Sequence, residues 1–292
     1  MGSYGLMLLI AFTLTGCALP KHEVGLNKLL QEELGESRNG IPAYRCTVGA
    51  HRGSSIEYME NTLNALKAAN ASRKYAFVEF DIQYSKDNRI VVFHDRRLLR
   101  LFGSARSVGN TTLAELEEIT GGEVCTYEEA IAAVDKRLNI EIKSQGDDGE
   151  DARLADEVID DLRRRGRLGD VMVSSISGNV LKYIKSKYPD IPTGKIHWLT
   201  RSTYLHLDSL TEGLYADLED TGADYLMLHV SNLRNIERLL ALKPNGKTII
   251  FWDFKDNMFL VHKDLSDRVW GDSGTKNWLK QARYGFLHPP HD

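Results

Sequence analysis

Short apolar runs rich in β-branched residues alternate with amphipathic segments of helix length along most of this chain. Eight runs have the length of strands, and they lie at residues 45–48, 77–82, 138–142, 171–174, 193–197, 225–228, 248–252 and 284–287. Strands that alternate with helices are typical of βαβ units, so the pattern predicts an α/β fold with a parallel sheet. Eight strands and roughly 250 residues are what a closed (β/α)8 TIM barrel needs. We therefore expect residues 43–292 to form such a barrel.

Two further patterns refine the predicted barrel. A doubly wound open sheet is the competing architecture, but the first strand is not followed by a Gly-rich turn of the dinucleotide or P-loop kind. Roughly forty residues lie between Ser85 and Thr126, after the second strand, which is too many for a barrel loop. They include a strand-like run at 90–93. We therefore expect a small insertion at about 85–126, after the second barrel strand.

The charge balance and the cysteines exclude several classes of protein. The chain has 37 Lys and Arg against 41 Asp and Glu, a formal net charge of −4. No global positive field would attract nucleic acid, so local charges must bind any anionic substrate. The chain has 3 cysteines, too few for a disulfide framework. Cys46 and Cys125 are expected to be free thiols or to pair with each other, and the sequence leaves both possibilities open.

The N-terminus has the pattern of an export signal. Residues 1–20 contain no charged side chain, and residues 6–14 form a short apolar run. That run is too short for a membrane span, which needs roughly 20 apolar residues. It ends in small residues followed by a cysteine, a segment that resembles the lipobox of bacterial lipoproteins: Leu14-Thr15-Gly16-Cys17.

The lipobox resemblance implies that the Cys17 thiol carries a lipid and becomes the mature N-terminus. Residues 1–16 would then be a signal peptide, and 17–42 a tether with a short helix. The protein would be exported to the bacterial cell envelope and anchored to a membrane surface rather than embedded. The alternative is a frayed apolar N-terminus of a cytosolic protein.

Two predicted strands carry acidic residues where a barrel interior should be apolar. Side chains two apart in a strand share a face, so Glu79 and Asp81 point together, as do Asn139, Glu141 and Lys143. Buried ionised groups are costly unless they are paired or bind a cation. Three carboxylates form an oxygen cage suited to a hard divalent cation such as Mg²⁺ or Ca²⁺ rather than zinc. The alternative is a structural network in which the lysine neutralises part of the charge.

Two histidines follow strands near these carboxylates. His51 comes after the first strand, at the barrel end where active sites form, with Arg52 beside it. His94 follows the strand-like run and is backed by Asp95. A phosphodiester needs its charge neutralised, a proton removed from the nucleophile and a proton supplied to the leaving oxygen. A cation together with an arginine could neutralise the charge, and two histidines could carry out the two proton transfers. The alternative is that each histidine is structural, which is more common for a lone histidine after a strand.

These residues resemble the glycerophosphodiester phosphodiesterase family in order and spacing. The matching segments are His51-Arg52-Gly53, Glu60-Asn61-Thr62, Glu79-Phe80-Asp81, Ser85-Lys86-Asp87, His94-Asp95 and Glu141-Ile142-Lys143. Weaker similarity continues at 173–175 and 251–252. The resemblance implies a barrel that hydrolyses a glycerophosphodiester to glycerol 3-phosphate and an alcohol.

The resemblance also implies roles for individual residues. Glu79, Asp81 and Glu141 would hold the divalent cation, while His51 and His94 would be the acid/base pair. We expect His51 to be the base and His94 the acid.

The phosphate would be met by two cationic side chains. Arg52 and Lys143 match the family residues that bind it, and Glu60 resembles a supporting carboxylate. Trp252 is as consistent with the pocket wall as with the core. The C-terminal wall of the pocket differs from the family pattern, with Asp253 in place of a threonine. The identity of the alcohol part of the substrate is therefore left open.

Three alternative functions remain open. One is a related barrel of the phospholipase D or sphingomyelinase D type that acts on intact or lysophospholipids, although the third cation position would there be Asp rather than Glu141. Another is a non-catalytic binding lipoprotein of the envelope. The last is a barrel whose polar interior is only structural.

Overall fold

Seven of the eight predicted strands are present in the computed structural model of the chain. The structure describes residues 46–198, 208–229, 232, 239, 241–254 and 257–261. The predicted strand 284–287, the signal peptide 1–16 and the tether 17–42 lie outside these residues. Within the described ranges, no helix is long and apolar enough to cross a membrane.

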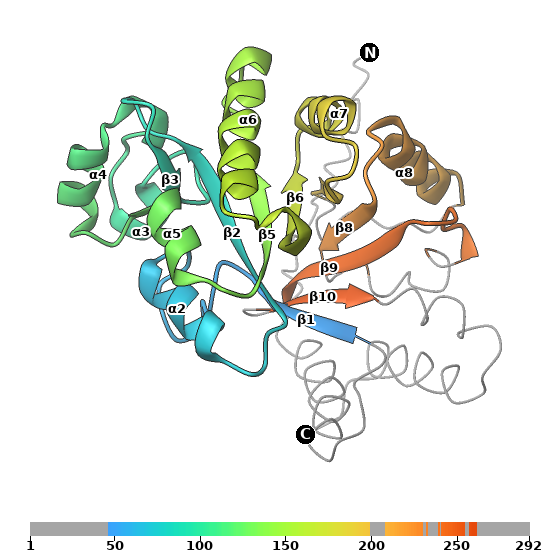
Figure 1. Cartoon of the computed structure of the whole chain (residues 1–292), viewed down its shortest axis with the longest axis horizontal. Helices are drawn as coiled ribbons and strands as arrows, with labels where there is room; N and C mark the ends of the chain where they lie inside the picture. The colour runs from blue at the N-terminus through green and yellow to red at the C-terminus, as the bar shows by residue number, and fades with distance from the viewer. Residues whose placement is uncertain are drawn as a thin grey trace, which may run out of the picture.

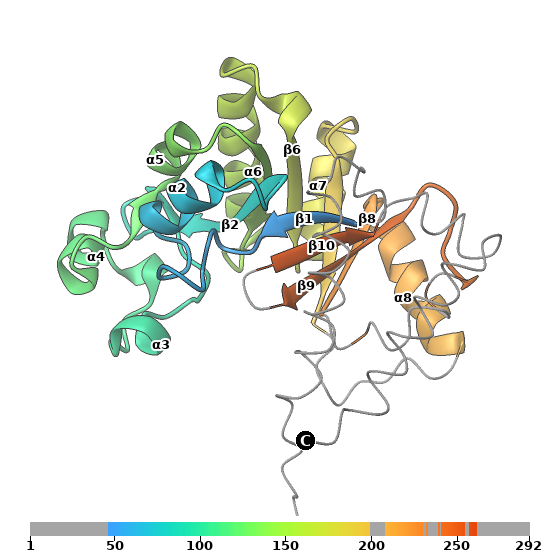
Figure 2. The same cartoon turned by 90° about the horizontal axis from the view of Figure 1, so that it is seen from below.

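Eight strands pair in a ring, which is the TIM barrel expected from the alternating pattern. They are β1 (Cys46–Ala50), β2 (Phe77–Tyr84), β5 (Arg137–Ile142), β6 (Val171–Ser175), β7 (Thr193–His197), β8 (Tyr225–His229), β9 (Thr248–Phe254) and β10 (Asn257–Val261). Each strand pairs with the next in this order, and β1 pairs with both β2 and β10. The helices lie outside this ring, and α6, α7 and α8 follow one another along it (Figure 1, Figure 2).

The strand β10 departs from the predicted all-parallel barrel. It pairs antiparallel with both β9 and β1. Only residues 255 and 256 separate β9 from β10, whereas a parallel connection needs a crossover of roughly a dozen residues. The two strands therefore form a hairpin, and its second strand completes the ring.

The α-helices in the described part of the chain are α2 (Leu63–Ala71), α3 (Leu99–Phe102), α4 (Leu113–Thr120), α5 (Tyr127–Ala133), α6 (Asp148–Arg164), α7 (Gly178–Lys187) and α8 (Asp208–Asp220). The sequence contains the signals that start several of them. Asp147 accepts hydrogen bonds from the backbone N–H groups of Gly149 and Glu150 at the start of α6, and Thr126 caps α5 in a capping box with Glu129. These oxygens satisfy N–H groups that have no partner within the helix.

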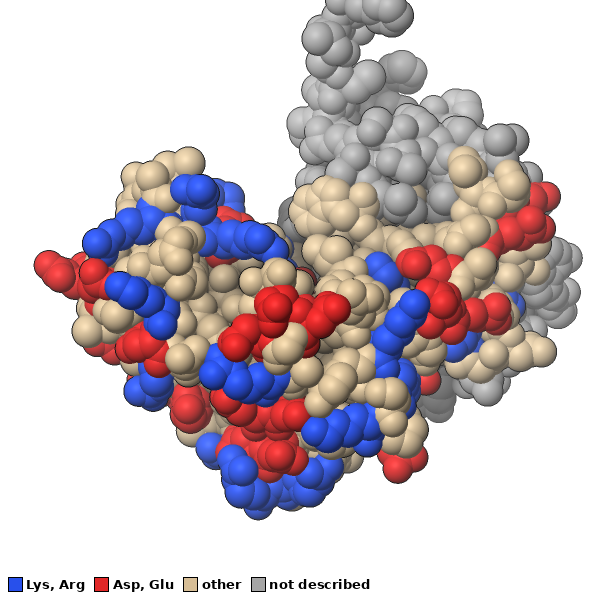
Figure 3. Space-filling view, turned by 90° about the horizontal axis from the view of Figure 1, so that it is seen from above, with Lys and Arg blue, Asp and Glu red and all other residues tan. Residues whose placement is uncertain are grey.

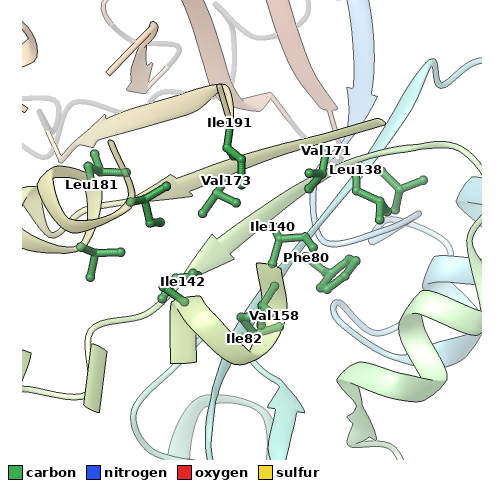
Figure 4. Packing of buried hydrophobic residues seen from close by; sticks show 14 of the residues in the cluster. Phe80, Ile82, Leu138, Ile140, Ile142, Val158, Val171, Val173, Leu181 and Ile191 are labelled. Atoms are coloured by element: carbon green, nitrogen blue, oxygen red, sulfur yellow. The ribbon is translucent and has the colours of Figure 1, made fainter. Parts of the chain in front are cut away.

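The core lies between the barrel strands and the helices around them. Phe80 and Ile82 from β2, with Ile140 and Ile142 from β5, are fully buried on this side, close to Val158 of α6 (Figure 4). Residues that alternate with them along the strands point into the barrel instead. The period of two residues thus separates the apolar packing layer from the polar interior.

The insertion after β2 brings a further segment to the barrel mouth. It contains β3 (Ile90–Val92), antiparallel to β2, then α3, the 3-10 helix η2 (Val108–Asn110), α4 and β4 (Cys125–Thr126), which pairs with β3. A small apolar cluster around Leu98 and Leu116 holds it together. The Phe93 N–H donates to the Asp81 carbonyl at 3.0 Å, so the residues after β3 return to the barrel interior.

Candidate functional site

Three carboxylates meet inside the barrel on adjacent strands. Asp81 of β2 lies opposite Glu141 of β5 in the parallel register, and Glu79 lies opposite Asn139. The exposed fractions of Glu79, Asp81 and Glu141 are 1%, 0% and 7%. One oxygen from each lies within 4.8 Å of the others. The predicted carboxylate cage is therefore present.

Two cationic groups and an amide contact the carboxylates. The Lys143 ammonium lies 2.7 Å from Asp81 Oδ1 and also donates to Glu141 Oε1. The Asn61 side-chain amide donates to Asp81 Oδ2 at 2.7 Å, and its oxygen accepts from the Asp81 N–H. The Arg52 side chain lies 3.6 Å from Asp81 Oδ2. Asp81 is thus the most heavily compensated of the three.

The pKa values of the carboxylates follow from this uneven compensation. Burial raises the pKa of Glu79 well above its usual range, and the charges of Asp81 and Glu141 raise it further. Burial also raises the pKa of Glu141, to about 7, against the opposing effect of Lys143. For Asp81, burial acts in the same direction, but Lys143, His94 and Arg52 outweigh it and hold the pKa well below the usual range. The cage therefore retains protons that a bound cation would displace.

The segment after β1 wraps around Glu79 through a strained turn. Arg52 and Asn61 both have a φ of 58°, in the left-handed region that non-glycine residues seldom adopt. The Arg52 N–H donates to Glu79 Oε2 at 2.7 Å, and the Asn61 N–H donates to the Arg52 carbonyl at 3.0 Å. A side chain at Gly53 would lie 2.7 Å from the Ala65 backbone. The turn thus explains why Arg52, Gly53 and Asn61 occur at this spacing.

Arg52 reaches from this turn toward two acidic groups. Its Nη1 donates to Glu60 Oε1 at 2.8 Å. Burial lowers its pKa, but Asp81, Glu60 and Glu79 outweigh this effect and raise the pKa above its usual value. The guanidinium is therefore a permanent cation at the edge of the cage.

His51 lies in a pocket that is polar on one side and apolar on the other. The polar side consists of His51, Arg52, Glu79, Asn139, Glu141 and Lys143, and the apolar side of Ile176, Ile196, Trp198, Met227 and Trp252. The His51 ring lies 6.1 Å from the Trp252 ring, centroid to centroid. Trp252 is 5% exposed, and its indole N–H has no hydrogen-bond partner among the described residues. Trp252 therefore belongs both to the buried packing and to the pocket wall.

His94 follows β3 in the insertion and is held by its neighbour Asp95. Its Nδ1 is 2.6 Å from Asp95 Oδ1, and Gln83 fixes the segment by donating to the carbonyls of Phe93 and Asp95. Burial lowers the pKa of His94, and Lys143 and Arg52 lower it further against the opposing effects of Asp81 and Asp95. An Nδ1–H that points to Asp95 leaves Nε2 for a ligand.

Arg100 is a site residue that the sequence patterns did not indicate. Its Nη1 and Nη2 donate to both oxygens of Glu60 at 2.9 and 2.6 Å, and its Nε donates to Asp95 Oδ2 at 2.7 Å. It therefore joins Glu60, the partner of Arg52, to Asp95, the partner of His94. Burial raises the pKa of Glu60, but Arg100 and Arg52 outweigh this effect and lower it.

Neither periodicity nor spacing indicated Arg100, because it lies in a short helix of the insertion and contacts a loop that is distant in sequence.

The alternation along β5 predicted that Asn139 lies beside the carboxylates, and its side chain accepts a hydrogen bond from Ser174 at 2.8 Å. Cys125 is a buried free thiol, which resolves the open question about this cysteine. The side chain of Cys46 and the whole of Cys17 lie outside the described residues.

The donor set fits a hard divalent cation. All three groups are carboxylates from rigid strands, and neither histidine nor cysteine contributes. Oxygen-only sites of this kind suit Mg²⁺ or Ca²⁺. Lys143 neutralises part of the carboxylate charge, as the alternative of a purely structural network predicts. The pKa values of Glu79 and Glu141 nevertheless remain raised. The protein's own cations thus do not keep all three carboxylates in the ionised form.

Comparison with known proteins agrees with this geometry. The model of the glycerophosphoryl diester phosphodiesterase family matches residues 51–278. A glycerophosphodiester phosphodiesterase of Bacillus subtilis is 25% identical over 211 residues, which cover 64% of this chain and 71% of that protein. A human lysophospholipase D is 28% identical over 195 residues, and the match covers 57% of each chain. This chain therefore spans a little over half the length of the human relative.

Solved structures share the fold. A glycerophosphodiester phosphodiesterase from Thermotoga maritima is 25% identical with a TM-score of 0.55, covering 81% of this chain and 91% of that one. An Oleispira antarctica phosphodiesterase, solved with its product sn-glycerol-3-phosphate, is 23% identical with a TM-score of 0.56, covering 72% and 85%. The family match extends over most of the barrel and includes every residue of the pocket's polar side, so this chain belongs to the glycerophosphoryl diester phosphodiesterase family.

Proposed function

We propose that this protein hydrolyses glycerophosphodiesters to glycerol 3-phosphate and an alcohol with the help of Mg²⁺ or Ca²⁺. The observation that carries the proposal is the buried cage of Glu79, Asp81 and Glu141, which shares a pocket with His51 and the cationic Arg52 and Lys143. A cation bound there would neutralise phosphate charge and polarise the phosphorus for attack.

Arg52 and Lys143 are the residues that meet the phosphate. Both line the pocket next to the cage, and both are held there by carboxylates rather than by solvent. An arginine fork suits two phosphate oxygens, and a lysine supplies a point charge. They stabilise the charge that develops on the oxygens during displacement.

His51 and His94 are the pair that moves protons. His51 takes the proton of the attacking glycerol hydroxyl or water, and His94 donates one to the leaving alcohol oxygen. Its lowered pKa leaves His94 neutral at pH 7 before substrate binds. A phosphodiester anion beside the ring raises this pKa, because negative charge stabilises the imidazolium. Substrate binding thus supplies the protonated form that an acid needs.

A lysophospholipid is the second candidate substrate. The apolar side of the pocket, with Ile176, Trp198 and Trp252, offers a surface for a long alcohol. The human relative named lysophospholipase D supports the same alternative. Comparing turnover of a lysophospholipid with that of a deacylated glycerophosphodiester separates the two substrates.

The test is release of glycerol 3-phosphate from glycerophosphodiesters by the purified protein, with EDTA and with added Mg²⁺ or Ca²⁺. We expect product only with cation, and losses of roughly 100-fold or more in His51→Ala and Glu79→Gln. His197→Gln is the matched control, because His197 contacts Asp217 of α8 and does not line the pocket. Full activity after removal of cation would contradict the mechanism. Binding of substrate without any product would instead support a non-catalytic envelope protein.

We also propose that the protein is exported and lipid-anchored at Cys17. The support is the uncharged N-terminus with its short apolar run and the Leu14-Thr15-Gly16-Cys17 segment. Mass spectrometry of the protein from a bacterial membrane fraction should find a lipid-modified N-terminal peptide that begins at Cys17, and a peptide that retains Met1 would exclude this.

A further inference from the structure

The exposed large apolar side chains of this protein gather at one end of the barrel. Seven are strongly exposed in the described part of the chain: Ile56 (60%), Leu99 (58%), Trp198 (56%), Leu210 (48%), Tyr58 and Ile176 (45%) and Met59 (38%). Six of them follow the carboxyl ends of the barrel strands β1, β6 and β7, where the pocket opens, and Leu99 lies in the insertion. We call these seven residues the apolar rim.

The connections between the elements place the members of the rim on the side of the barrel where the pocket opens. Ile56, Tyr58 and Met59 lie between β1 and α2, Ile176 follows β6, and Trp198 follows β7. Leu210 lies in the first turn of α8, which comes after β7. Leu99 precedes Arg100, whose hydrogen bonds to Glu60 bring α3 against the β1–α2 loop. The rim thus comes from four separate parts of the chain that share one face.

The rim continues into the pocket itself. Ile176 and Trp198 belong both to the rim and to the pocket's apolar side, and Trp198 lies 5.2 Å from the Trp252 ring. An apolar path therefore leads from the surface to the residues next to the cage. Such a path suits a ligand whose phosphodiester enters the pocket while its apolar part stays at the surface.

The rim also carries exposed charge, which is positive beside Leu99. Arg96 and Arg97 are exposed beside Leu99. Exposed acids lie next to other members of the rim: Glu57 beside Ile56, and Asp208 and Glu212 on either side of Leu210. The charge of the molecule is otherwise mixed, with Lys and Arg beside Asp and Glu, as the face in Figure 3 shows. Apolar side chains with flanking arginines are the combination that binds the boundary between phospholipid headgroups and acyl chains.

We propose that the apolar rim docks on a phospholipid surface, with the pocket mouth facing the lipid. A protein partner on this face would close the mouth, whereas a lipid surface leaves it open to molecules that lie in that surface. The part of this inference that concerns substrate delivery rests on the proposed function, but the docking itself does not. Ile56 and Leu99 have the largest exposed fractions of the seven, and neither lines the pocket.

The test measures binding of the full-length protein to vesicles of phosphatidylcholine and phosphatidylglycerol by sedimentation. The first variant combines Ile56→Ser with Leu99→Ser, and the second combines Arg96→Ser with Arg97→Ser. The matched control combines Arg163→Ser with Arg164→Ser, two exposed arginines at the carboxyl end of α6, which is the opposite end of the barrel. All chains keep the same N-terminus, so differences between them report on the rim alone.

We expect the apolar variant to bind vesicles about tenfold or more weakly, because it removes two insertable side chains. The arginine variant should lose affinity mainly for vesicles that contain phosphatidylglycerol, and the control should bind like the wild type. Trp198 fluorescence should be quenched by spin-labelled lipid in the wild type, and Trp198→Phe identifies this contribution. Equal binding by the wild type and both rim variants would overturn the proposal.

Kinetics separate docking from catalysis. The apolar variant should keep its turnover of a water-soluble glycerophosphodiester and lose turnover of a lysophospholipid presented in vesicles. If the protein proves inactive on both substrates, the proposed function fails while the vesicle experiment still decides the docking. An equal loss on both substrates in a folded variant that binds vesicles normally would count against the rim.

Discussion

Removing one carboxylate from the cage should change how the stability of the metal-free protein depends on pH. Glu141 is buried, and its pKa rises from an ordinary value of 4.5 to about 7. A raised carboxyl pKa means that the folded state holds the proton more tightly than the unfolded state. Its contribution to stability is therefore complete below pH 4.5 and disappears as the pH rises through 7. A rise of the pKa from 4.5 to about 7 corresponds to about 3 kcal/mol of stability.

Glu141→Gln removes this titration while keeping the shape of the side chain. In EDTA, the free energy of unfolding of the variant should rise relative to that of the wild type by about 3 kcal/mol as the pH goes from 4.5 to 8. This is equivalent to about 6–12 °C in Tm for a domain of this size. Saturating Mg²⁺ or Ca²⁺ should reverse the order at pH 8, because the wild type binds the cation with one more carboxylate. Thermal melts followed by circular dichroism across this pH range measure both effects.

The matched control is Glu118→Gln, which changes an exposed glutamate on α4. It should follow the wild-type pH profile with and without cation. Parallel pH profiles for the wild type and Glu141→Gln in EDTA would refute the reasoning, because they would mean that Glu141 titrates alike in the folded and unfolded chains.

Three further changes probe other parts of the molecule. A lysine at position 100 has no guanidinium to bridge Glu60 and Asp95, so in Arg100→Lys kcat should fall roughly 10- to 100-fold with little change in KM. The pKa that His94 contributes to the pH–rate profile should rise, because Asp95 then interacts more strongly with His94. An unchanged pH–rate profile would exclude a positioning role for Arg100. Ile140→Ala should lower the free energy of unfolding by about 2–5 kcal/mol in urea titrations, since Ile140 is fully buried, and a loss under 1 kcal/mol would show that the site is not tightly packed. Burial, with Glu129 nearby, raises the pKa of Cys125 to about 12, so peptide mapping after iodoacetamide treatment at pH 8 should find it alkylated only in unfolded protein.

The carboxylate cage was predictable because strand geometry is local. A period of two residues places Glu79 and Asp81 on one face, and the same period places Glu141 beside Lys143. Only the pairing of β2 with β5 sets the two faces against each other, and that pairing followed from the barrel hypothesis. The histidines were predictable as residues after strands, although their contacts were not.

Arg100 and the apolar rim show where sequence reasoning ends. Arg100 contacts Glu60 forty residues away in sequence, a contact that requires the insertion to fold back over the β1–α2 loop. The rim residues come from separate loops and share no period. The strand β10, which forms a hairpin with β9 and also pairs with the distant β1, was missed as well.

The sequence by itself determined the alternation of strands and helices, the polar face of two strands, and the motif order that identifies the family. These features depend on neighbours within a few residues, where backbone geometry decides which side chains share a face. Only the tertiary structure decided how the cage is compensated, because the Lys143, Arg52 and Asn61 contacts and the pKa values depend on distances between strands and loops. Burial and electrostatic coupling act through space, and so the protonation of the site and the apolar surface at its mouth appear only when the chain is folded.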